Sequence, residues 1–457
     1  MAQFTDVDLK PALRQALEAA EYRTMTPVQA ASLPAILAGQ DVIAQAKTGS
    51  GKTAAFALGL LSRLDAGAVS LQGLVLCPTR ELAEQVSREV RRLASCIPNV
   101  KVLTLCGGVP VRTHVASLAH EPHIVIGTPG RIVDLITRGA LDLSQVGVLV
   151  LDEADRMLDM GFNDDITAIA ASVPALRQTL LFSATYADEV RAISADFQRD
   201  PVAVSVAAVL SANELQQVFV EVDEWSRFGV LTSLLDEQRP DAAVIFCNTK
   251  QSVRELCTQL AESGHSALAL HGDLEQRDRD EVLLRFVNHS ATLLVATDVA
   301  ARGLDIEALP LVVNYELAHE PEIHVHRIGR TGRAGRRGLA VSLCLGKDRR
   351  RVAAIEEGLR EAIEWRKLAA TREPIKPLVA PMATLIIDGG RQDKLRAGDL
   401  LGALTGSAGV PADAIGKIDI FPQRSYVAIQ RRCFETAFKG LASGRIKKRR
   451  FRARRLS

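Results

Sequence analysis

The chain has 457 residues, which is too long for one ordinary domain and enough for two or three. Hydrophobic residues make up 47% and charged residues 24%, which excludes a mostly disordered protein because enough apolar surface is available for cores. The formal charge is +2, but residues 380–457 hold 16 Lys and Arg against 6 Asp and Glu, a charge of +10 that leaves −8 for the rest. This basic end predicts contact with a polyanion.

The seven cysteines are scattered, odd in number and never form a CxxC pair, so they predict neither a zinc site nor a disulfide framework. The N-terminus lacks the pattern of a signal peptide, and no apolar run approaches the ~18 residues of a membrane span. We therefore expect a cytoplasmic protein without a membrane partner.

Short apolar runs separated by helix-like stretches recur along the chain, and they predict its fold class. The first series covers residues 74–77, 124–126, 148–151 and 180–182, and the second covers 244–247, 293–296, 311–313 and 340–344. Continuous apolar runs are typical of parallel strands that are buried on both faces by helices. The sequence thus predicts an α/β protein with two parallel-sheet domains in tandem.

Two junctions divide the chain further. We expect domains at 1–206, 215–370 and 382–457, joined by linkers at 207–214 and 371–381. The second linker contains Pro374, Pro377 and Pro381, and such a proline density predicts an extended, stiff connector. We expect it to let the basic last domain dock independently.

A phosphate-binding loop follows the strand candidate at 41–44 and precedes an apolar helix at 54–64. Its glycines allow backbone N–H groups to surround phosphate oxygens, and the helix N-terminus adds positive potential. Lys52 is expected to reach the β- and γ-phosphates of a nucleotide, and Thr53 to bind Mg²⁺. The loop consists of Ala46, Lys47, Thr48, Gly49, Ser50, Gly51, Lys52 and Thr53.

The acidic tetrapeptide at 152–155 comes directly after the strand at 148–151. A carboxylate at this place beside a phosphate loop is expected to hold Mg²⁺, which assigns that role to Asp152. Glu153 is expected to act as the general base that activates water. Without the phosphate loop, such a tetrapeptide would more often be a solvated turn.

Asp-Glu-Ala-Asp is characteristic of the DEAD-box ATP-dependent RNA helicases, which the chain resembles over residues 4–370. The resemblance implies two RecA-like domains and an adenine site made by Thr26, Gln29 and the aromatic Phe4. An amide such as that of Gln29 can both donate to and accept from the edge of adenine. Glu21 stands where the family has a glycine.

Further motifs of the family follow in order. Residues 183–185 resemble motif III, residues 296–305 motif V and residues 326–333 motif VI. The resemblance implies that Asp305 contacts the ribose, that His326 joins the water network, and that Arg330 and Arg333 face the γ-phosphate. Such arginines can contribute roughly 10³–10⁵ in rate. Because these groups lie in different domains, ATP and RNA must bring the domains together before hydrolysis.

RNA is expected at two helix starts that follow apolar strands and offer free N–H groups together with an arginine. Each start, taken alone, would as readily be an ordinary capped helix. By the resemblance, a glycine pair and the QxxR motif of the second domain add further contacts, and Thr297 of motif V belongs with them. The residues are Pro78, Thr79, Arg80, Gly107, Gly108, Thr128, Pro129, Arg131, Gln276, Arg279 and Thr297.

The last domain has a predicted βαββαβ order, with strands at 383–387, 415–420, 426–429 and 444–456 and helices at 399–404 and 433–441. This order resembles a small α+β RNA recognition motif. Leu385, Arg424 and Ile429 stand at places where that motif has stacking aromatics, so recognition should depend on basic side chains such as Arg445, Lys447 and Lys448. The eight basic residues between 445 and 455 are expected to face no acid. A structural mini-domain with a solvated basic end is the alternative.

Over its whole length the chain resembles the DbpA subfamily of bacterial DEAD-box proteins. The resemblance implies a hairpin of 23S rRNA, helix 92, as the target, and pre-50S particles as the partner. Two alternatives stay open: a general RNA remodeller, and an ATP-gated RNA clamp that need not unwind. No coiled-coil heptads are present, so a monomer is expected.

Overall fold

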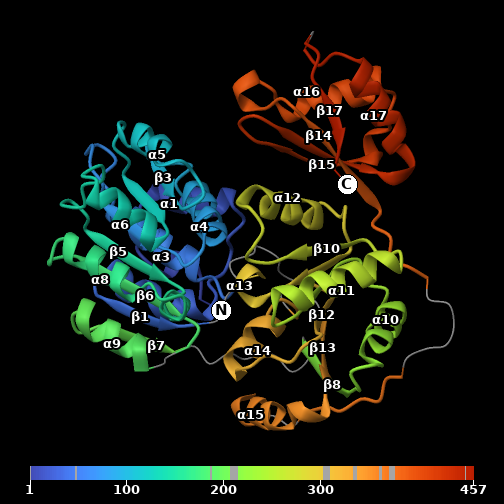
Figure 1. The fold of residues 1–457 in the computed structure, drawn as a ribbon. Coiled ribbons are helices and arrows are strands. Elements are labelled where there is room, and N and C mark those ends of the chain that lie inside the picture. Colours follow the sequence, from blue (N-terminus) through green and yellow to red (C-terminus); the bar gives the residue numbers. More distant parts are fainter. Residues whose placement is uncertain are drawn as a thin grey trace. The chain divides into compact units, whose positions relative to one another are not determined.

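The computed structural model describes residues 2–46, 49–185, 188–205, 215–301, 309–332, 337–359, 363–369, 376–447 and 449–456. The chain forms two compact units, the first built on one β-sheet and the second on two (Figure 1). Within the described ranges, every helix is too short or too polar to cross a membrane. The predicted linker at 207–214 lies outside these ranges.

The first sheet has seven parallel strands in the order β3-β4-β2-β5-β6-β1-β7. Its central strands are buried on both faces, which explains why they appear in the sequence as unbroken apolar runs. The strands are β1 (Val42–Gln45), β2 (Gly73–Leu76), β3 (Val102–Leu105), β4 (Ile124–Gly127), β5 (Val148–Asp152), β6 (Gln178–Ser183) and β7 (Val202–Ser205).

Helices cover both faces of this sheet. One core joins alternate strand residues to α1 (Pro11–Ala19), α2 (Pro27–Leu37), α3 (Lys52–Arg63) and α4 (Arg80–Leu93). The opposite core uses α5 (Val111–Leu118), α6 (Pro129–Thr137), α7 (Ala154–Asp159), α8 (Asn163–Ser172) and α9 (Asp188–Phe197). The phosphate loop after β1 and the motifs after β2 to β6 follow the carboxyl ends of parallel strands, the usual ligand-binding edge of such sheets, whereas Thr26 and Gln29 precede β1.

The second sheet has six parallel strands in the order β10-β11-β9-β12-β13-β8. They are β8 (Leu215–Glu221), β9 (Ala243–Phe246), β10 (Ala267–Leu270), β11 (Leu293–Ala296), β12 (Leu311–Asn314) and β13 (Gly338–Cys344). The helices are α10 (Arg227–Gln238), α11 (Lys250–Glu262), α12 (Gln276–Val287), α13 (Asp298–Ala301), α14 (Pro321–Ile328) and α15 (Arg349–Leu359).

The third sheet is antiparallel, in the order β15-β16-β14-β17. It contains β14 (Met382–Ile387), β15 (Ile415–Ile420), β16 (Ser425–Gln430) and β17 (Ala453–Arg455), with α16 (Ala397–Gly402) and α17 (Phe434–Ser443) on one face. The predicted fold class is confirmed, including the βαββαβ order. The last strand is shorter than expected, three residues instead of the whole basic segment at 444–456.

The connector before the third sheet packs against the second domain. Leu378 is 5% exposed and belongs to the core of the second sheet. Its N–H donates to Nδ1 of His265 at 3.0 Å, and its carbonyl accepts from the N–H of Ser266 at 2.8 Å. The expectation that this connector lets the last domain dock independently is therefore wrong, because an apolar side chain anchors it to the second domain.

We predict that Leu378→Ala lowers the free energy of unfolding by about 2–4 kcal/mol, because it opens a cavity in a packed core. It should also expose the connector to limited proteolysis. Val379→Ala is the matched control, since that neighbour is 56% exposed. Equal urea unfolding curves and equal proteolysis for the two variants would show that Leu378 does not anchor the connector.

Candidate nucleotide and RNA sites

The phosphate loop depends on a glycine directly before α3. Gly51 has φ +93°, a conformation that L side chains rarely adopt, and an added Cβ would lie 2.5 Å from Nε2 of Gln29. Lys52 follows as the first residue of α3 and is only 5% exposed. Ala46 ties the loop to β6 through its N–H, which donates to the carbonyl of Ser183 at 2.9 Å. Lys47 and Thr48 lie outside the described residues.

Two buried carboxylates follow β5, and both are almost inaccessible to solvent. Asp152 is 2% and Glu153 3% exposed, and Glu153 adopts the left-handed conformation with φ 54°. Burial raises the pKa of Asp152 above its usual range, while the nearby charge of Lys52 lowers it and Glu153 raises it again. The Lys52 ammonium therefore helps to keep this carboxylate ionised.

Two charged side chains at this place have unsatisfied polar atoms. Nζ of Lys52 and Oδ1 of Asp152 are buried and find no hydrogen-bond partner among the described residues. Buried polar atoms without partners are rare in native proteins and are expected where a ligand supplies the partner. The pair therefore fits a nucleotide with its Mg²⁺, the ion that Thr53 and Asp152 would hold.

The structure adds two partners that the sequence did not single out. Arg156 donates to Glu153 at 2.6 Å, and both side chains are buried. Asp155 accepts hydrogen bonds from the N–H groups of Ala184 and Thr185 at 3.0 and 2.9 Å. Asp155 is thus bonded directly to the segment after β6, the motif III segment. In the sequence, the only indication of this contact was the position of Asp155 within the acidic tetrapeptide.

Gln29 contacts the phosphate loop rather than open space. Its Oε1 accepts from the N–H of Thr26 at 2.9 Å, and its Nε2 donates to the carbonyl of Gly51 at 3.0 Å. Thr26 in turn caps α2 through its hydroxyl. Both ends of the Gln29 amide already contact protein, so its contact with adenine stays a prediction.

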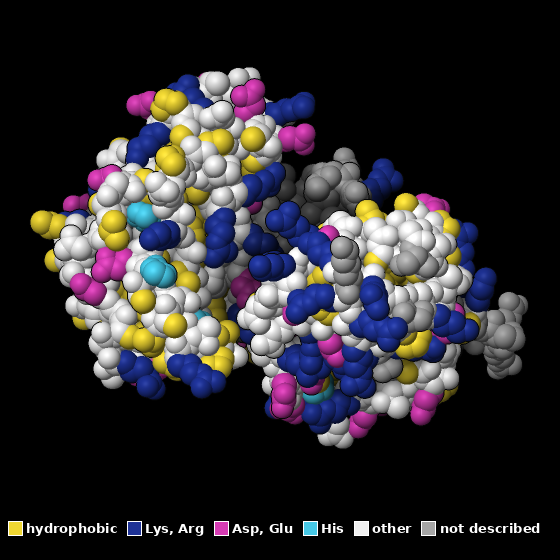
Figure 2. Space-filling model, turned by 90° about the horizontal axis from the view of Figure 1, so that it is seen from above, with side chains coloured by type: hydrophobic (Ala, Val, Ile, Leu, Met, Phe, Trp, Pro, Cys, Tyr) yellow, Lys and Arg dark blue, Asp and Glu magenta, His cyan; other side chains and the backbone are white. Residues whose placement is uncertain are grey.

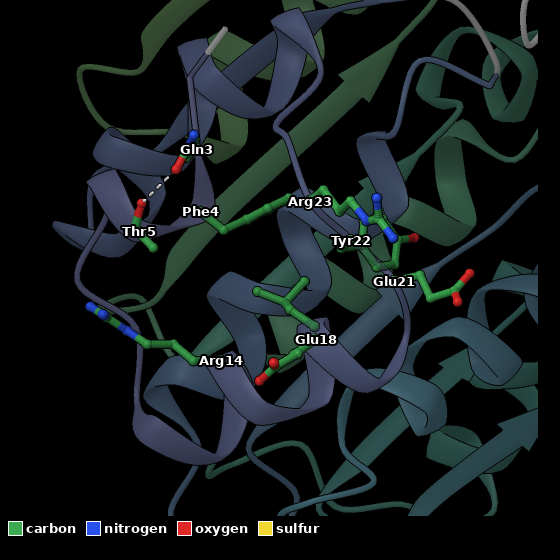
Figure 3. A pocket seen from close by; sticks show the side chains of 9 residues that line it. Gln3, Phe4, Thr5, Arg14, Glu18, Glu21, Tyr22 and Arg23 are labelled. Atoms are coloured by element: carbon green, nitrogen blue, oxygen red, sulfur yellow. Dashed lines mark hydrogen bonds between the residues drawn. The ribbon is translucent and has the colours of Figure 1, made fainter.

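A cavity of about 550 Å³ lies beside the predicted adenine site (Figure 3). Phe4 is 6% exposed and extends toward Tyr22, whose ring centroid is 6.0 Å away. Glu21 on the rim has φ 59°, which explains why a glycine suits this position. The cavity is lined by Gln3, Phe4, Thr5, Arg14, Leu17, Glu18, Glu21, Tyr22 and Arg23.

The two predicted RNA contacts of the first unit differ in their local geometry. Thr79 caps α4, since its hydroxyl accepts from the N–H of Leu82 at 3.3 Å. Thr128 stands at the cap of α6 before Pro129, but its side chain makes no capping bond. Arg80 pairs with Glu84 at 2.9 Å. Pro78, like Thr79, is buried.

The glycine pair at 107–108 combines open space with a special backbone conformation. An added Cβ at Gly107 would meet no atom within 4 Å, and Gly108 has φ 80°. This exposed turn leaves open space beside the backbone, and its contact with an RNA phosphate stays a prediction. It leads directly to Val109, whose carbonyl accepts from Arg131 at 2.8 Å.

In the second unit, predicted RNA contacts gather around α12 and α13. Gln276 begins α12 and donates to Asp280 at 2.9 Å, while Arg279 donates to the carbonyl of Ala300 at 3.4 Å. Thr297 directly precedes α13 and is 8% exposed. These contacts join the QxxR motif to the motif V helix.

Arg327 is the main residue of this unit that the sequence interpretation missed. It is 1% exposed and binds both oxygens of Asp298, at 2.5 and 2.7 Å. It also donates to Oδ1 of Asn248 at 2.7 Å and to the carbonyl of Glu316 at 2.6 Å. His326 precedes it on α14, and Arg330 is 5% exposed. The predicted Asp305 and Arg333 lie outside the described residues.

The two central strands of the third sheet, β14 and β16, are covered by protein on their open face. Thr384 bonds to Asn288 at 3.0 Å and to Ser290 at 2.8 Å, while the hydroxyl of Tyr426 donates to Glu281 of α12 at 2.9 Å. The open-face side chains of the two central strands are buried: Thr384, Ile386, Tyr426 and Ala428. Asp419 of β15 and Arg454 of β17, the cross-strand partners of Tyr426 and Ile386, stay 26% and 33% exposed. The second domain therefore covers the central part of this face.

Two details of the predicted RNA recognition motif are wrong. Leu385 and Ile429 are fully buried in the core against α16 and α17, so neither occupies a stacking place on the open face. Arg424 does lie at that face, 3.6 Å from Glu281 and 3.8 Å from Asp388. The alternation of side chains in a strand places neighbours on opposite faces, so Leu385 was assigned to the wrong face, and Ile429, five residues after Arg424, lies on the face opposite to it.

The basic C-terminal residues do face acids, contrary to expectation. Folding brings acids from elsewhere in the domain against them, at distances from 2.6 to 3.9 Å. The pairs are Lys447–Asp399, Arg449–Asp393, Arg454–Asp388 and Arg455–Glu435. Arg445 and Lys447 are exposed, and Lys448 lies outside the described residues. Lys and Arg still crowd the right-hand part of the face in Figure 2.

Comparison with protein-family models gives three matches along the chain. Residues 26–193 match DEAD/DEAH box helicases, residues 226–335 the helicase conserved C-terminal domain, and residues 384–455 the DbpA RNA binding domain. The chain is 52% identical to the ATP-dependent RNA helicase DbpA of Escherichia coli over 448 residues, 98% of each chain.

The chain belongs to the DEAD-box family. It is an ATP-dependent RNA helicase, an enzyme that hydrolyses ATP and binds RNA, and it resembles the DbpA subfamily over its whole length. The DEAD-box helicase CshA of Geobacillus kaustophilus is 43% identical and covers 80% of this chain, with 79% of its own length matched. Among solved structures, Saccharomyces cerevisiae Dbp5 bound to RNA and ADP BeF3 superposes with a TM-score of 0.72 at 30% identity, over 80% of this chain and 96% of Dbp5.

We predict that Gly51→Ala weakens ATP binding by about tenfold or more, because the new Cβ would displace Gln29 from the helicase's phosphate loop and strain the backbone. Equilibrium titration with a fluorescent ATP analogue measures the change. Gly398→Ala is the control, since a Cβ there meets no atom within 4 Å. Unchanged affinity in Gly51→Ala would contradict the role given to this glycine.

Proposed function

We propose that this DEAD-box helicase acts on 23S rRNA, at the helix 92 hairpin, and on pre-50S particles in the cytoplasm, as a monomer. The observation that carries the proposal is the full-length similarity to E. coli DbpA, which includes the C-terminal RNA binding domain. The match to CshA covers 80% of this chain, at 43% identity, against 98% for E. coli DbpA. We therefore base the choice of target on the C-terminal domain and not on the helicase core. Contacts to phosphate and 2′-OH distinguish RNA sequences poorly.

Hydrolysis is assigned to the buried groups after β1 and β5. Lys52 binds the terminal phosphates, and Glu153 accepts a proton from the attacking water while Arg156 fixes the orientation of its carboxylate at 2.6 Å. When bound, Mg²⁺ held by Thr53 and Asp152 would neutralise charge on the phosphates. Arg330 and Arg333 of the second unit are proposed to complete the site when ATP and RNA are bound.

We assign the choice of the RNA target to the domain that contains the third sheet. The second domain covers the central strands of its open face, so RNA would contact the remaining surfaces, where Arg445 and Lys447 are exposed. Four of the basic residues there already pair with acids, so counterion release on RNA binding should be smaller than the formal charge of this domain implies. Recognition of the shape of one hairpin then contributes more to the choice of RNA than charge attraction does.

The expected result is a clear preference of the full-length protein for one RNA. At ~0.15 M salt, a 23S rRNA fragment containing helix 92 should half-saturate the ATPase at a concentration at least about tenfold lower than a scrambled hairpin of equal length. Steady-state ATPase titrations with both RNAs measure this. Equal half-saturation would favour the general RNA remodeller, and tight RNA binding without turnover would favour the clamp.

A further inference from the structure

A buried histidine lies beside Arg131, a predicted phosphate-binding arginine of the first unit. His114 of α5 is 5% exposed, and its Nδ1 lies 2.7 Å from Nη1 of Arg131. The same Nη1 donates to the carbonyl of Val109 at 2.8 Å. The guanidinium of Arg131, whose side chain is 12% exposed, is thus held on one edge by two acceptors.

The contact fixes the charge state of the imidazole. An arginine offers only donors and stays protonated, so Nδ1 of His114 must accept and the ring must be neutral, with its proton on Nε2. Burial lowers the pKa of His114, and the charges of Arg131 and Arg80 lower it further. The geometry and the surrounding charges therefore agree on an uncharged acceptor.

A neutral acceptor has a specific advantage at this place. A carboxylate would hold Arg131 equally well but would cancel its positive charge, which a phosphate needs. Asp134 of α6 makes a long ion pair with this arginine, 4.0 Å from its Nε, while its short contact, at 2.6 Å, is to Arg138. Imidazole and carbonyl fix the side chain and leave its charge for the ligand. Because Val109 follows Gly108 directly, the same guanidinium also ties α6 to the glycine turn.

We propose that His114 is a positioning residue for RNA binding, which orients Arg131 toward the RNA backbone without neutralising it. The inference rests on the proposed contact between Arg131 and RNA phosphate. It assigns His114 no contact with ATP and no part in hydrolysis.

The test measures the RNA concentration for half-maximal ATPase, together with kcat and ATP affinity, in the full-length protein. His114→Leu removes the acceptor, so half-saturation by RNA should need about tenfold more RNA, while kcat and ATP affinity stay within about twofold. His114→Asn is the conservative variant, because its Oδ1 takes the place of Nδ1 and can accept. It should stay within about twofold of the parent.

His114→Asp tests the charge of the acceptor beside Arg131 separately from its position. It keeps an acceptor beside Arg131 but adds a negative charge, so it should also raise the RNA requirement by about tenfold. Since a carboxylate paired with arginine is compatible with folding, this variant decides the question even if the leucine variant unfolds. Parent-like RNA dependence of His114→Asp or of folded His114→Leu would overturn the inference.

Arg131→Ala distinguishes this failure from failure of the RNA site itself. If Arg131→Ala raises the RNA requirement while the His114 variants do not, the RNA contact stands and the positioning role is overturned. If Arg131→Ala has no effect, the RNA contact on which the inference rests is overturned.

Discussion

The opposed charges of Lys52 and Asp152 are the constraint on which the rest of this helicase depends. Both are buried, and each has a polar atom without a partner among the described residues. Burying charge incompletely paired costs free energy, and a fold tolerates it only where the surrounding structure holds the groups in place. Here that support comes from a seven-stranded parallel sheet with a core on each face. The fold itself therefore organises the predicted nucleotide site.

From this centre, hydrogen bonds extend to neighbouring motifs. Gln29 connects α2 to the phosphate loop, and Asp155 connects α7 to the segment after β6. In the second unit, Arg327 plays the corresponding part by bonding α14 to Asp298. Each link is a buried polar contact between segments far apart in sequence. A change of ligand at one motif can therefore alter the hydrogen bonds of the next motif, which suits an enzyme that couples ATP hydrolysis to RNA binding.

The elements that depend on the local pattern of residues could be predicted from the sequence. Unbroken apolar runs gave the parallel strands, and the loop at 46–53 and the acids at 152–155 followed from their places after β1 and β5. What depends on tertiary contact was missed or wrong. The partner of Lys447 is Asp399, 48 residues earlier, and the anchoring of Leu378 needs the core of another sheet. Leu385 was placed on the wrong face because a strand assignment that is off by one residue exchanges its two faces.

The central claim is that Lys52 and Asp152 are held at a cost in stability in order to bind ATP. The most direct measurement is the thermal unfolding midpoint of the full-length protein, with and without ATP and Mg²⁺, for the parent and for Lys52→Met combined with Asp152→Asn. Without ligand, the double variant should unfold at the same temperature as the parent or higher, because neutral groups of similar size replace incompletely paired charges. Ligand should raise the midpoint of the parent only. A lower midpoint for the ligand-free variant, or equal stabilisation of both proteins by ATP, would contradict the account.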